Sequence, residues 1–300
     1  MDKNEMSSVE YFSQLTLKNR IILAAAERSA SFGLGAALSV LRWLLLEDFG
    51  ALLISMPDNH FPNLSRVLPR MASEEVQAAW TAAKGFALLE QTIVFMRLVS
   101  DRYEKLTGKK MRDARILDFG CGYGRLMRTM AYHADPAQIY GCDPWQNSID
   151  IAMNDGMFGH LALSARVPDQ LPFPGTFDLI YAYSVFTHLP EPIAARCLQT
   201  LADALAPQGL LVITIRPIEY WAVSPYKHQE QLRDEKMHEH RTRGFAFVPH
   251  GWEPIDGVVP FGDASFVPEW VERTIPRLQL ADRPRWGGPL QTTISLKRRG

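Results

Sequence analysis

The chain has 300 residues, enough for one large domain with additions, and its 32 basic residues balance 33 acidic ones. A nucleic-acid-binding surface usually leaves an excess of Lys and Arg, so we expect no nucleic-acid partner. The three cysteines form no C-x-x-C pair, and the polar start M-D-K-N-E-M-S-S is unlike a secretory signal. We therefore expect a cytoplasmic protein.

Residues 1–110 are predicted to form a helical N-terminal extension or cap. Its most apolar stretch, Ser31 to Leu46, is shorter than the ~18–20 residues of a membrane span and includes a charged side chain, so we expect a buried or interfacial helix and no stable membrane span. Three prolines within Met56 to Pro69 predict a loop. Ser73 is a predicted N-cap, and Gly85 a break in the helical pattern that follows. Trp80 is expected to pack over the core. These helices are also where we expect a homodimer contact.

A glycine-rich segment follows the first predicted strand, Ile116 to Phe119. Gly120, Gly122 and Gly124 come at alternate positions, and helical spacing begins at Leu126. Glycines so placed allow a tight turn and let a ligand lie against the backbone. The G-x-G-x-G spacing differs from the dinucleotide fingerprint G-x-G-x-x-G. Asp118, two residues earlier, would repel a pyrophosphate and attract a cation, so the segment predicts a binding site for a different ligand.

Strands and helices alternate through the next hundred residues. Further strands are predicted at Ile139–Cys142, Leu161–Leu163, Phe177–Tyr183 and Leu210–Ile215, with helices at Asn147–Met153 and Glu191–Leu205. This alternation predicts a parallel sheet with right-handed crossovers. Asp143 ends the second strand, and an acid at that position is typical of residues that hold a ribose diol.

The segment from 218 to about 260 is rich in aromatic residues and histidines, and we interpret it as an insertion that forms a substrate cap over the carboxyl ends of the strands. Tyr220, Trp221 and Trp252 are candidates for stacking on an acceptor. The charged run in its middle predicts a solvated helix. A His-x-His pair in that run lacks further ligands at suitable spacing, so we expect no metal. A last helix at Pro268–Ile275 and strands at 278–281 and 290–296 complete the pattern.

Several motifs in this order resemble one family. I-L-D-F-G-C-G-Y-G, Y-G-C-D-P, the run L-P-F-P-G-T-F-D-L-I-Y-A-Y-S-V-F-T-H-L and L-A-P-Q-G-L-L-V-I-T are similar to successive motifs of class I S-adenosylmethionine-dependent methyltransferases. Gln77, Trp80 and Gly85 resemble a pattern in a bacterial subgroup associated with small molecules and glycans. The resemblance implies an α/β, Rossmann-like, seven-stranded and mostly parallel sheet with a closing antiparallel hairpin, as a methyltransferase domain over residues 111–300.

The resemblance also implies S-adenosyl-L-methionine as the cofactor and assigns its contacts. The positions that would bind the cofactor are Asp118, Gly120, Cys121, Gly122, Gly124, Asp143, Pro144, Ala165, Arg166, Tyr183 and Ser184. Of these, the glycine loop would hold the methionine portion, Asp143 the ribose, Ala165 and Arg166 the adenine, and Tyr183 and Ser184 the methyl end. Asp169 is the nearest acid to the expected adenine amino group. Two simpler roles stay open: Asp118 as a turn cap, and Ser184 as a cap of the next helix.

The catalytic base is less determined by the sequence. His188 follows the fourth strand and is a candidate base at neutral pH, with a helix-capping or packing role as the alternative. His250 in the insertion is a second candidate, and Glu219 and Tyr220 are others. We predict an enzyme that transfers a methyl group to oxygen of a small-molecule or glycan-linked acceptor. A non-catalytic cofactor-binding module and a nicotinamide-dependent oxidoreductase are the alternatives, and the glycine spacing disfavours the second.

Overall fold

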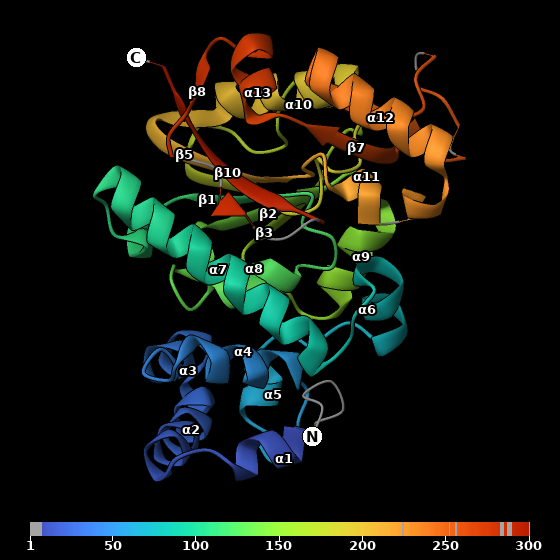
Figure 1. The fold of residues 1–300 in the computed structure, drawn as a ribbon. Helices are drawn as coiled ribbons and strands as arrows, with labels where there is room; N and C mark the ends of the chain where they lie inside the picture. The colour runs from blue at the N-terminus through green and yellow to red at the C-terminus, as the bar shows by residue number, and fades with distance from the viewer. Residues whose placement is uncertain are drawn as a thin grey trace. The chain divides into compact units, whose positions relative to one another are not determined.

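The computed structural model describes residues 8–223, 225–251, 253–255, 257–282, 285–286 and 290–299 (Figure 1). Two compact units divide the chain. Unit 1 contains the described residues up to Asp101 together with Lys110–Asp113 and Cys121–Leu163. Unit 2 contains Arg102–Lys109, Ala114–Gly120 and the described residues from Ser164 onward.

Helices make up most of unit 1. In chain order they are α1 (Ser8–Ser13), α2 (Leu17–Ser29), η2 (Ala30–Phe32), α3 (Leu34–Leu41), α4 (Leu46–Ile54), α5 (Leu64–Val67), α6 (Glu74–Thr81), the start of α7 (Phe86–Thr107), η3 (Met111–Asp113), α8 (Arg125–Met130), η4 (Pro136–Gln138) and α9 (Gln146–Asn154). Ser73 caps α6 as predicted, because its hydroxyl accepts a hydrogen bond from the Val76 amide. Gly85, with φ +55°, precedes α7, which confirms the predicted break.

Two expectations for the N-terminal segment need correction. The apolar stretch Ser31–Leu46 is not one helix, because Gly33 adopts φ +103° and separates η2 from α3. The predicted loop at Met56–Pro69 contains the short helix α5. The carboxylate of Glu27, on α2, accepts hydrogen bonds from the amides of Asn63 and Leu64 and so caps α5 from a distant helix.

The N-terminal helices of unit 1 are joined to the helix that follows the glycine loop. Arg42 donates hydrogen bonds to the carbonyls of Ala131 and Ala134, just beyond α8. Tyr132 returns a hydrogen bond from its hydroxyl to the carbonyl of Leu44, at 2.8 Å. These contacts lie beside apolar packing in which Phe49 is fully buried and meets the Tyr132 ring edge-on. The N-terminal segment is therefore part of the same compact unit as α8.

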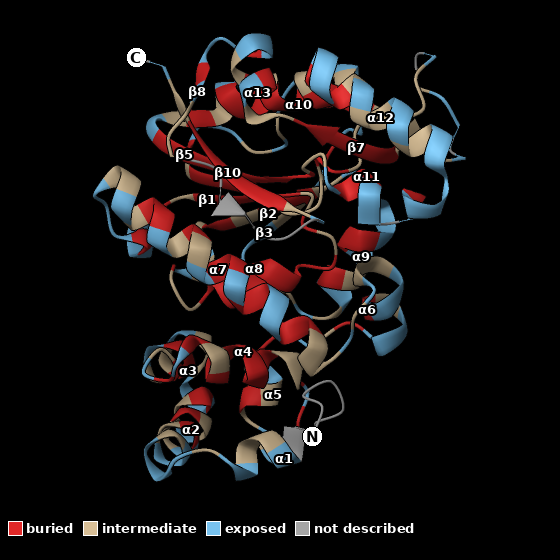
Figure 2. Cartoon of the chain, viewed as in Figure 1, coloured by how far each residue is buried: buried red, intermediate tan, exposed pale blue. Residues whose placement is uncertain are grey.

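The strands of unit 2 are nearly all buried. β1 (Ile116–Phe119), β4 (Phe177–Ala182) and β5 (Leu205–Ile215) run parallel, and β10 (Thr292–Arg298) runs antiparallel to β5. β8 (Leu278–Leu280) and β9 (Arg285–Trp286) pair antiparallel with β10. Continuous apolar runs fit this position, because a parallel strand covered on both faces has no solvent side (Figure 2).

The complete sheet order confirms the predicted fold class. Unit 1 adds the parallel strands β2 (Ile139–Asp143) and β3 (His160–Leu163). Seven strands then follow the order β3-β2-β1-β4-β5-β10-β8. The sheet is mostly parallel and closes with the antiparallel strands at the carboxyl-terminal end of the chain, as the Rossmann-like interpretation required.

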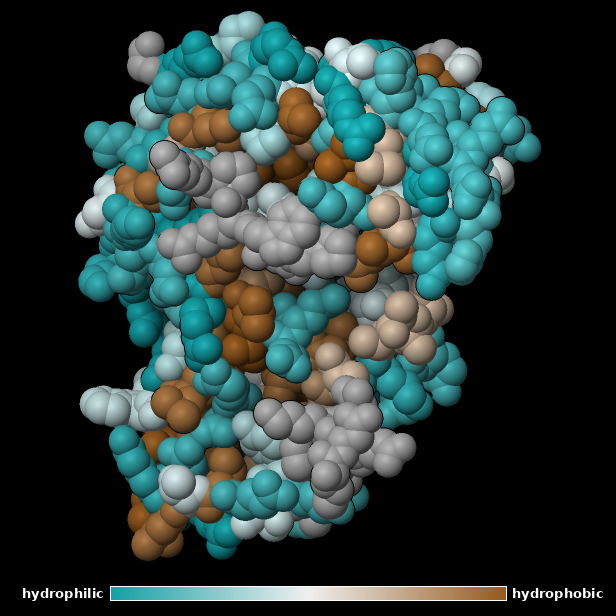
Figure 3. Space-filling view, viewed as in Figure 1, coloured by the Kyte–Doolittle hydropathy of each residue, from teal (hydrophilic) through white to brown (hydrophobic). Residues whose placement is uncertain are grey.

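The remaining elements of unit 2 follow β4 and β5. They are α10 (Glu191–Ala204), α11 (Tyr220–Val223), η5 (Tyr226–His228), α12 (Glu230–Arg243), β6 (Phe245–Pro249), β7 (Gly262–Phe266) and α13 (Pro268–Thr274). The charged run forms α12 as predicted, and its outer face is hydrophilic (Figure 3). The antiparallel pair β6–β7 was not predicted, and it joins the expected insertion to residues beyond it through pairs such as Phe245 with Phe266.

Surface features bear on two other expectations. Within the described part of the chain, no helix combines the length and apolar character needed to cross a membrane. Phe32 and Trp43, beside α3, are 86% and 76% exposed. A homodimer contact through the N-terminal helices stays a prediction.

Candidate functional site

The glycine loop has the backbone that its sequence predicts. Gly120, Gly122 and Gly124 have φ values of +77°, +54° and +78°, a left-handed region that residues with a Cβ rarely adopt. Close packing adds a second constraint, because a Cβ on Gly124 would lie 2.4 Å from the Met157 methyl carbon. The amide of Cys121 donates to the carbonyl of Cys142, which connects the loop to β2. The loop is therefore held in one shape by its own unit.

Asp143, at the carboxyl end of β2, fixes this loop directly. Its Oδ2 accepts a hydrogen bond from the Gly122 amide at 3.0 Å, and its Oδ1 accepts one from the Trp145 amide at 2.9 Å. Burial raises the pKa of Asp143, while these two hydrogen bonds and one from Ser148 act in the opposite direction. A carboxylate with two oxygens still has acceptor capacity beyond these bonds.

The buried guanidinium of Arg128 also contacts the loop. Arg128 on α8 is 1% exposed and donates to the carbonyl of Tyr123 and to the carbonyl of Arg70. Burial lowers the pKa of Arg128 to about 10, so the guanidinium still carries its charge at neutral pH. Its nearest acid is Asp155, at 3.9 Å.

Aromatic rings surround Gly122 within unit 1. Trp80 on α6 stacks with Trp145 at a centroid distance of 5.0 Å and an angle of 27°, and lies 5.5 Å from the Tyr123 ring. Two ring carbons of Trp80 lie 3.8 Å from the position that a Cβ on Gly122 would occupy. Trp80 therefore packs on the glycine loop, a more specific location than the core packing that the sequence suggested.

Unit 2 contains several of the other predicted cofactor positions. Asp118 is 1% exposed in β1 and lies opposite Tyr181 of β4. Ser184 follows β4 with φ +59°, a strained value for a residue with a Cβ. Its amide donates to the Thr214 hydroxyl, and its hydroxyl accepts a hydrogen bond from Gln291. Because α10 begins at Glu191 after the N-cap Pro190, the alternative that Ser184 caps this helix is wrong.

Four further positions are on the surface. Pro144, Ala165, Arg166 and Asp169 are exposed, the first in unit 1 and the other three in unit 2. Asp169 forms an ion pair with Arg196. Their assigned roles toward a cofactor stay predictions.

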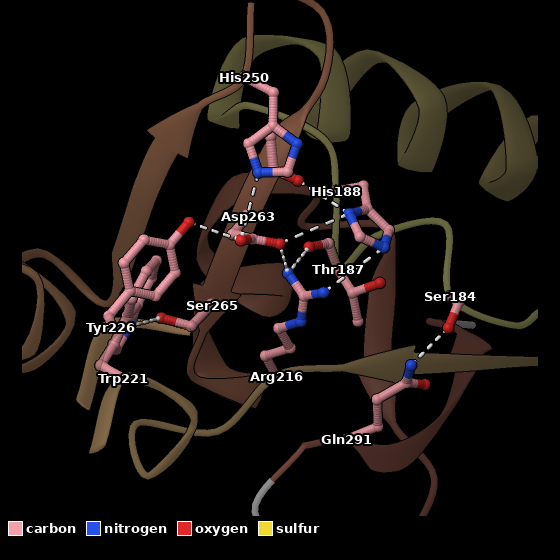
Figure 4. Close-up of polar contacts among 11 residues, drawn as sticks. Ser184, Thr187, His188, Arg216, Trp221, Tyr226, His250, Asp263, Ser265 and Gln291 are labelled. Carbon is pink, nitrogen blue, oxygen red and sulfur yellow. Dashed lines mark hydrogen bonds and ion pairs between the residues drawn. The ribbon is translucent and has the colours of Figure 1, made fainter. Parts of the chain in front are cut away.

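A buried polar network lies beyond the carboxyl ends of β4 and β5 (Figure 4). Arg216 comes directly after β5 and donates to Asp263 of β7 and to the carbonyl of Thr187. Asp263 also accepts a 2.6 Å hydrogen bond from the Tyr226 hydroxyl. Burial by itself would raise the pKa of Asp263, but the Arg216 charge and the donated hydrogen bonds outweigh it and hold that pKa below its ordinary value. The network therefore contains an ionised Asp–Arg pair.

His188 belongs to this network and does not cap a helix. Its Nδ1 lies 2.8 Å from the carbonyl of Gly262, which can only accept, and its Nε2 lies 3.5 Å from an Arg216 nitrogen, which can only donate. Its ring stacks on Phe261 at 4.7 Å. Burial, with the nearby Arg216 charge, lowers the pKa of His188 to about 4. The imidazole is therefore neutral at pH 7, and each nitrogen already has a partner.

His250 lies beside Oδ2 of the same Asp263 carboxylate. Its Nε2 lies 3.3 Å from Asp263 Oδ2, and its side chain is 39% exposed. An acceptor at that distance favours the tautomer with the proton on Nε2, which leaves Nδ1 as a lone-pair nitrogen.

The predicted acceptor-binding aromatic residues have different positions. Trp221 is fully buried, and its indole nitrogen donates to the Ser265 hydroxyl at 2.7 Å, so the structure gives it a core role in place of an exposed stacking face. Tyr220 is 4% exposed, and the Cζ atom of Arg216 lies 4.1 Å from the centroid of its ring. Trp252 lies outside the described residues. Glu219, another candidate base, is exposed.

Sequence reasoning missed Arg216, Asp263 and Ser265. Arg216 ends an apolar strand, where a charge is unremarkable. Asp263 and Ser265 alternate with apolar residues in F-G-D-A-S-F, a period-2 pattern that could have indicated a strand with polar side chains on one face. Among the residues that the structure describes, no group of three or more His, Cys, Asp or Glu side chains could hold a metal ion. The three cysteines are buried free thiols.

Comparisons with curated proteins find methyltransferases among the relatives of this chain. An uncharacterized methyltransferase of Schizosaccharomyces pombe is 26% identical over 128 residues, which cover 39% of this chain and 45% of that protein. A ubiquinone biosynthesis O-methyltransferase of Xanthomonas campestris is 29% identical over 105 residues, which cover 34% of this chain and 42% of that protein. The chain thus spans less than half the length of the curated relatives it matches.

Solved structures and a family model complete the comparison. A magnesium protoporphyrin IX methyltransferase from Synechocystis is 12% identical, with a TM-score of 0.45 over 71% of this chain and 87% of that chain. A methyltransferase from Clostridium acetobutylicum is 13% identical, with a TM-score of 0.44 over 72% and 98%. The family model described as a methyltransferase domain matches residues 88–253, more than half of the chain. The chain belongs to the methyltransferase domain family.

Proposed function

We propose that the protein is an S-adenosylmethionine-dependent methyltransferase. The observation that carries the proposal is the hydrogen bond from the Gly122 amide to Asp143, which ties a left-handed glycine loop to the acid at the end of β2. Such an arrangement presents backbone and carboxylate together to one ligand. Membership of the methyltransferase family supports this reading over a nicotinamide-dependent oxidoreductase.

The residues present fit this cofactor. Asp143 has acceptor capacity for a ribose hydroxyl beside the bonds it already makes. Tyr123, in the loop, is 2% exposed, and its hydroxyl has no hydrogen-bond partner among the described residues, so a polar ligand on the loop would supply one. Bound S-adenosylmethionine would supply a methyl group on a positively charged sulfur, and the sulfur leaves as a neutral thioether. The protein must position the acceptor, exclude water and accept a proton.

For proton acceptance we favour His250 over His188. Asp263 orients the His250 ring through Nε2, which leaves Nδ1 to receive a proton from an acceptor hydroxyl. In His188 both nitrogens already have partners, and burial lowers its pKa to about 4, which weakens it as a base. His188 is better suited to keep Gly262, and therefore Asp263, in place.

For the acceptor we propose a hydroxyl group of a small molecule. The name of the Xanthomonas relative, a ubiquinone biosynthesis O-methyltransferase, supports oxygen as the methylated atom. A histidine base also fits a phenolic or similarly acidic hydroxyl, since such a hydroxyl gives up its proton more readily than an ordinary alcohol. A glycan-linked acceptor is the second class to test.

Calorimetric titration with S-adenosylhomocysteine tests the cofactor. We expect binding to the wild type, no binding of NAD, and at least about tenfold weaker binding to Asp143→Ala, because hydrogen bonds to a charged group contribute about 1.5–3 kcal/mol each. Asp150→Ala is the matched control: Asp150 is an exposed acid in the same unit that bonds only to Gln146 among the contacts described. Failure of the wild type to bind S-adenosylhomocysteine would refute the proposal. Methyl transfer to a panel of phenols and catechols then separates an enzyme from a binding module.

A further inference from the structure

The ring of Trp80 lies beside the glycine loop. The residue lies on α6, far upstream of the glycine loop in the sequence, yet its ring lies 3.8 Å from the point where Gly122 would carry a Cβ. The ring is partly exposed and stacks on Trp145, whose side chain is 49% exposed and whose amide bonds to Asp143. Two accessible indole rings therefore stand beside the loop and its acid.

The position of Trp80 is fixed by buried hydrogen bonds. Gln77, one turn earlier on α6, is 4% exposed. Its side-chain nitrogen donates to the Ala72 carbonyl at 2.6 Å, and its side-chain oxygen accepts from the Gly85 amide at 2.9 Å. This one side chain thus connects the segments before and after the helix. Because a buried amide with both ends satisfied resists displacement, Trp80 is presented to the loop in a defined place.

Aromatic faces of this kind bind planar rings by stacking and cations through the ring quadrupole. An adenosyl sulfonium compound offers both a planar base and a positive charge. We propose that Trp80 contacts the cofactor held by the glycine loop, so that helix α6 supplies a cofactor-binding residue. This inference rests on the proposed function.

Affinity for S-adenosylhomocysteine is the first test. We expect Trp80→Ala to bind it about tenfold or more weakly than the wild type, and Trp80→Phe, which keeps an aromatic face, to recover most of the loss. Trp43→Ala is the control, since Trp43 belongs to the same unit and is 76% exposed. Wild-type affinity in Trp80→Ala would overturn the inference. Absence of binding to the wild type would instead refute the proposed function, so the two failures are distinguishable.

Fluorescence separates direct contact from support of the loop. Titration of the wild type with S-adenosylhomocysteine should change tryptophan emission through Trp80. In Trp80→Phe, with ligand binding verified by calorimetry, that change should fall by at least half. An undiminished emission change in a Trp80→Phe protein that still binds the ligand would overturn the inference, because the ligand would then act on other tryptophans. The measurement uses a variant that retains a ring, so it does not depend on Trp80→Ala folding normally.

Discussion

Two histidines, the partly buried His188 and the buried His240, should make the stability of the protein depend on pH between about 4 and 6.5. Burial lowers the pKa of His188 and of His240 from 6.5 to about 4, aided by the charge of Arg216 for the first and Arg241 for the second. His240 is 5% exposed, and its Nδ1 lies 2.8 Å from the Ser265 hydroxyl. Both rings are therefore neutral in the folded protein at pH values where they are protonated in the unfolded chain.

The sign of the effect follows from proton binding. Below pH 6.5 the unfolded chain takes up protons that the folded chain does not, so the free energy of unfolding falls as the pH is lowered. The stabilisation is fully present above pH 6.5 and is lost as the pH falls towards about 4. A pKa unit corresponds to about 1.4 kcal/mol, so each histidine should account for about 2 kcal/mol of the loss between pH 7 and pH 5. As the pH is lowered, this loss of stability occurs before Asp263 is protonated, because the pKa of Asp263 is held below its ordinary value.

Urea unfolding at pH 7 and pH 5 measures the difference. His188→Asn and His240→Asn keep a polar atom near the position of Nδ1 and remove the titration, so each should reduce the loss by about 2 kcal/mol. Their absolute stabilities will fall because volume is lost, which is why the difference between the two pH values is compared. His228→Asn, an exposed histidine of the same unit, is the control and should leave the difference unchanged. A double variant with the pH dependence of the wild type would refute the reasoning.

Two further predictions concern the polar network. Asp263→Asn should lower the free energy of unfolding by about 3–5 kcal/mol, because it leaves the buried Arg216 charge without its carboxylate. Asp169→Asn, which breaks an ion pair whose Asp169 side chain is 83% exposed, should hardly change it, and equal effects in urea unfolding would contradict this account. His250→Asn should lower the rate of methyl transfer to a phenolic acceptor by about 10²–10⁴-fold at unchanged S-adenosylhomocysteine affinity. His188→Asn should lower that rate far less per folded molecule. A larger loss of rate in His188→Asn than in His250→Asn would assign the base to His188.

Most elements of the sheet could be predicted from local sequence. The runs at Ile116 and Phe177 are apolar and bounded by turn residues, so they predict buried strands wherever they occur. The antiparallel pair β6–β7 could not be predicted in the same way. The alternation of Asp263 and Ser265 with apolar residues is compatible with a strand that is polar on one face. Every residue of β7 is nevertheless buried, and only the network that satisfies these two side chains explains why.

In the candidate site too, some residues could be predicted from the sequence, but their contacts could not. The sequence predicts Gly122 and Asp143 as binding residues, but the hydrogen bond that joins them depends on how the loop folds back to β2. The sequence allows three roles for His188: a base, a helix cap or a packing residue. The structure excludes the cap because α10 begins later, and it adds Arg216 as a partner that no spacing rule relates to His188.

The sequence by itself determined the fold class, the strand–glycine loop–helix unit and the family, because each depends on residues that are neighbours in the chain: apolar runs, alternate glycines and the acids next to them. Only the tertiary structure decided which polar side chains are partners. Glu27 caps α5, Gln77 spans the ends of α6, and Asp263 neutralises Arg216. Each of these pairings satisfies a buried polar group at long or irregular separation along the chain, and a group buried from water must find its partner wherever the packed chain brings one.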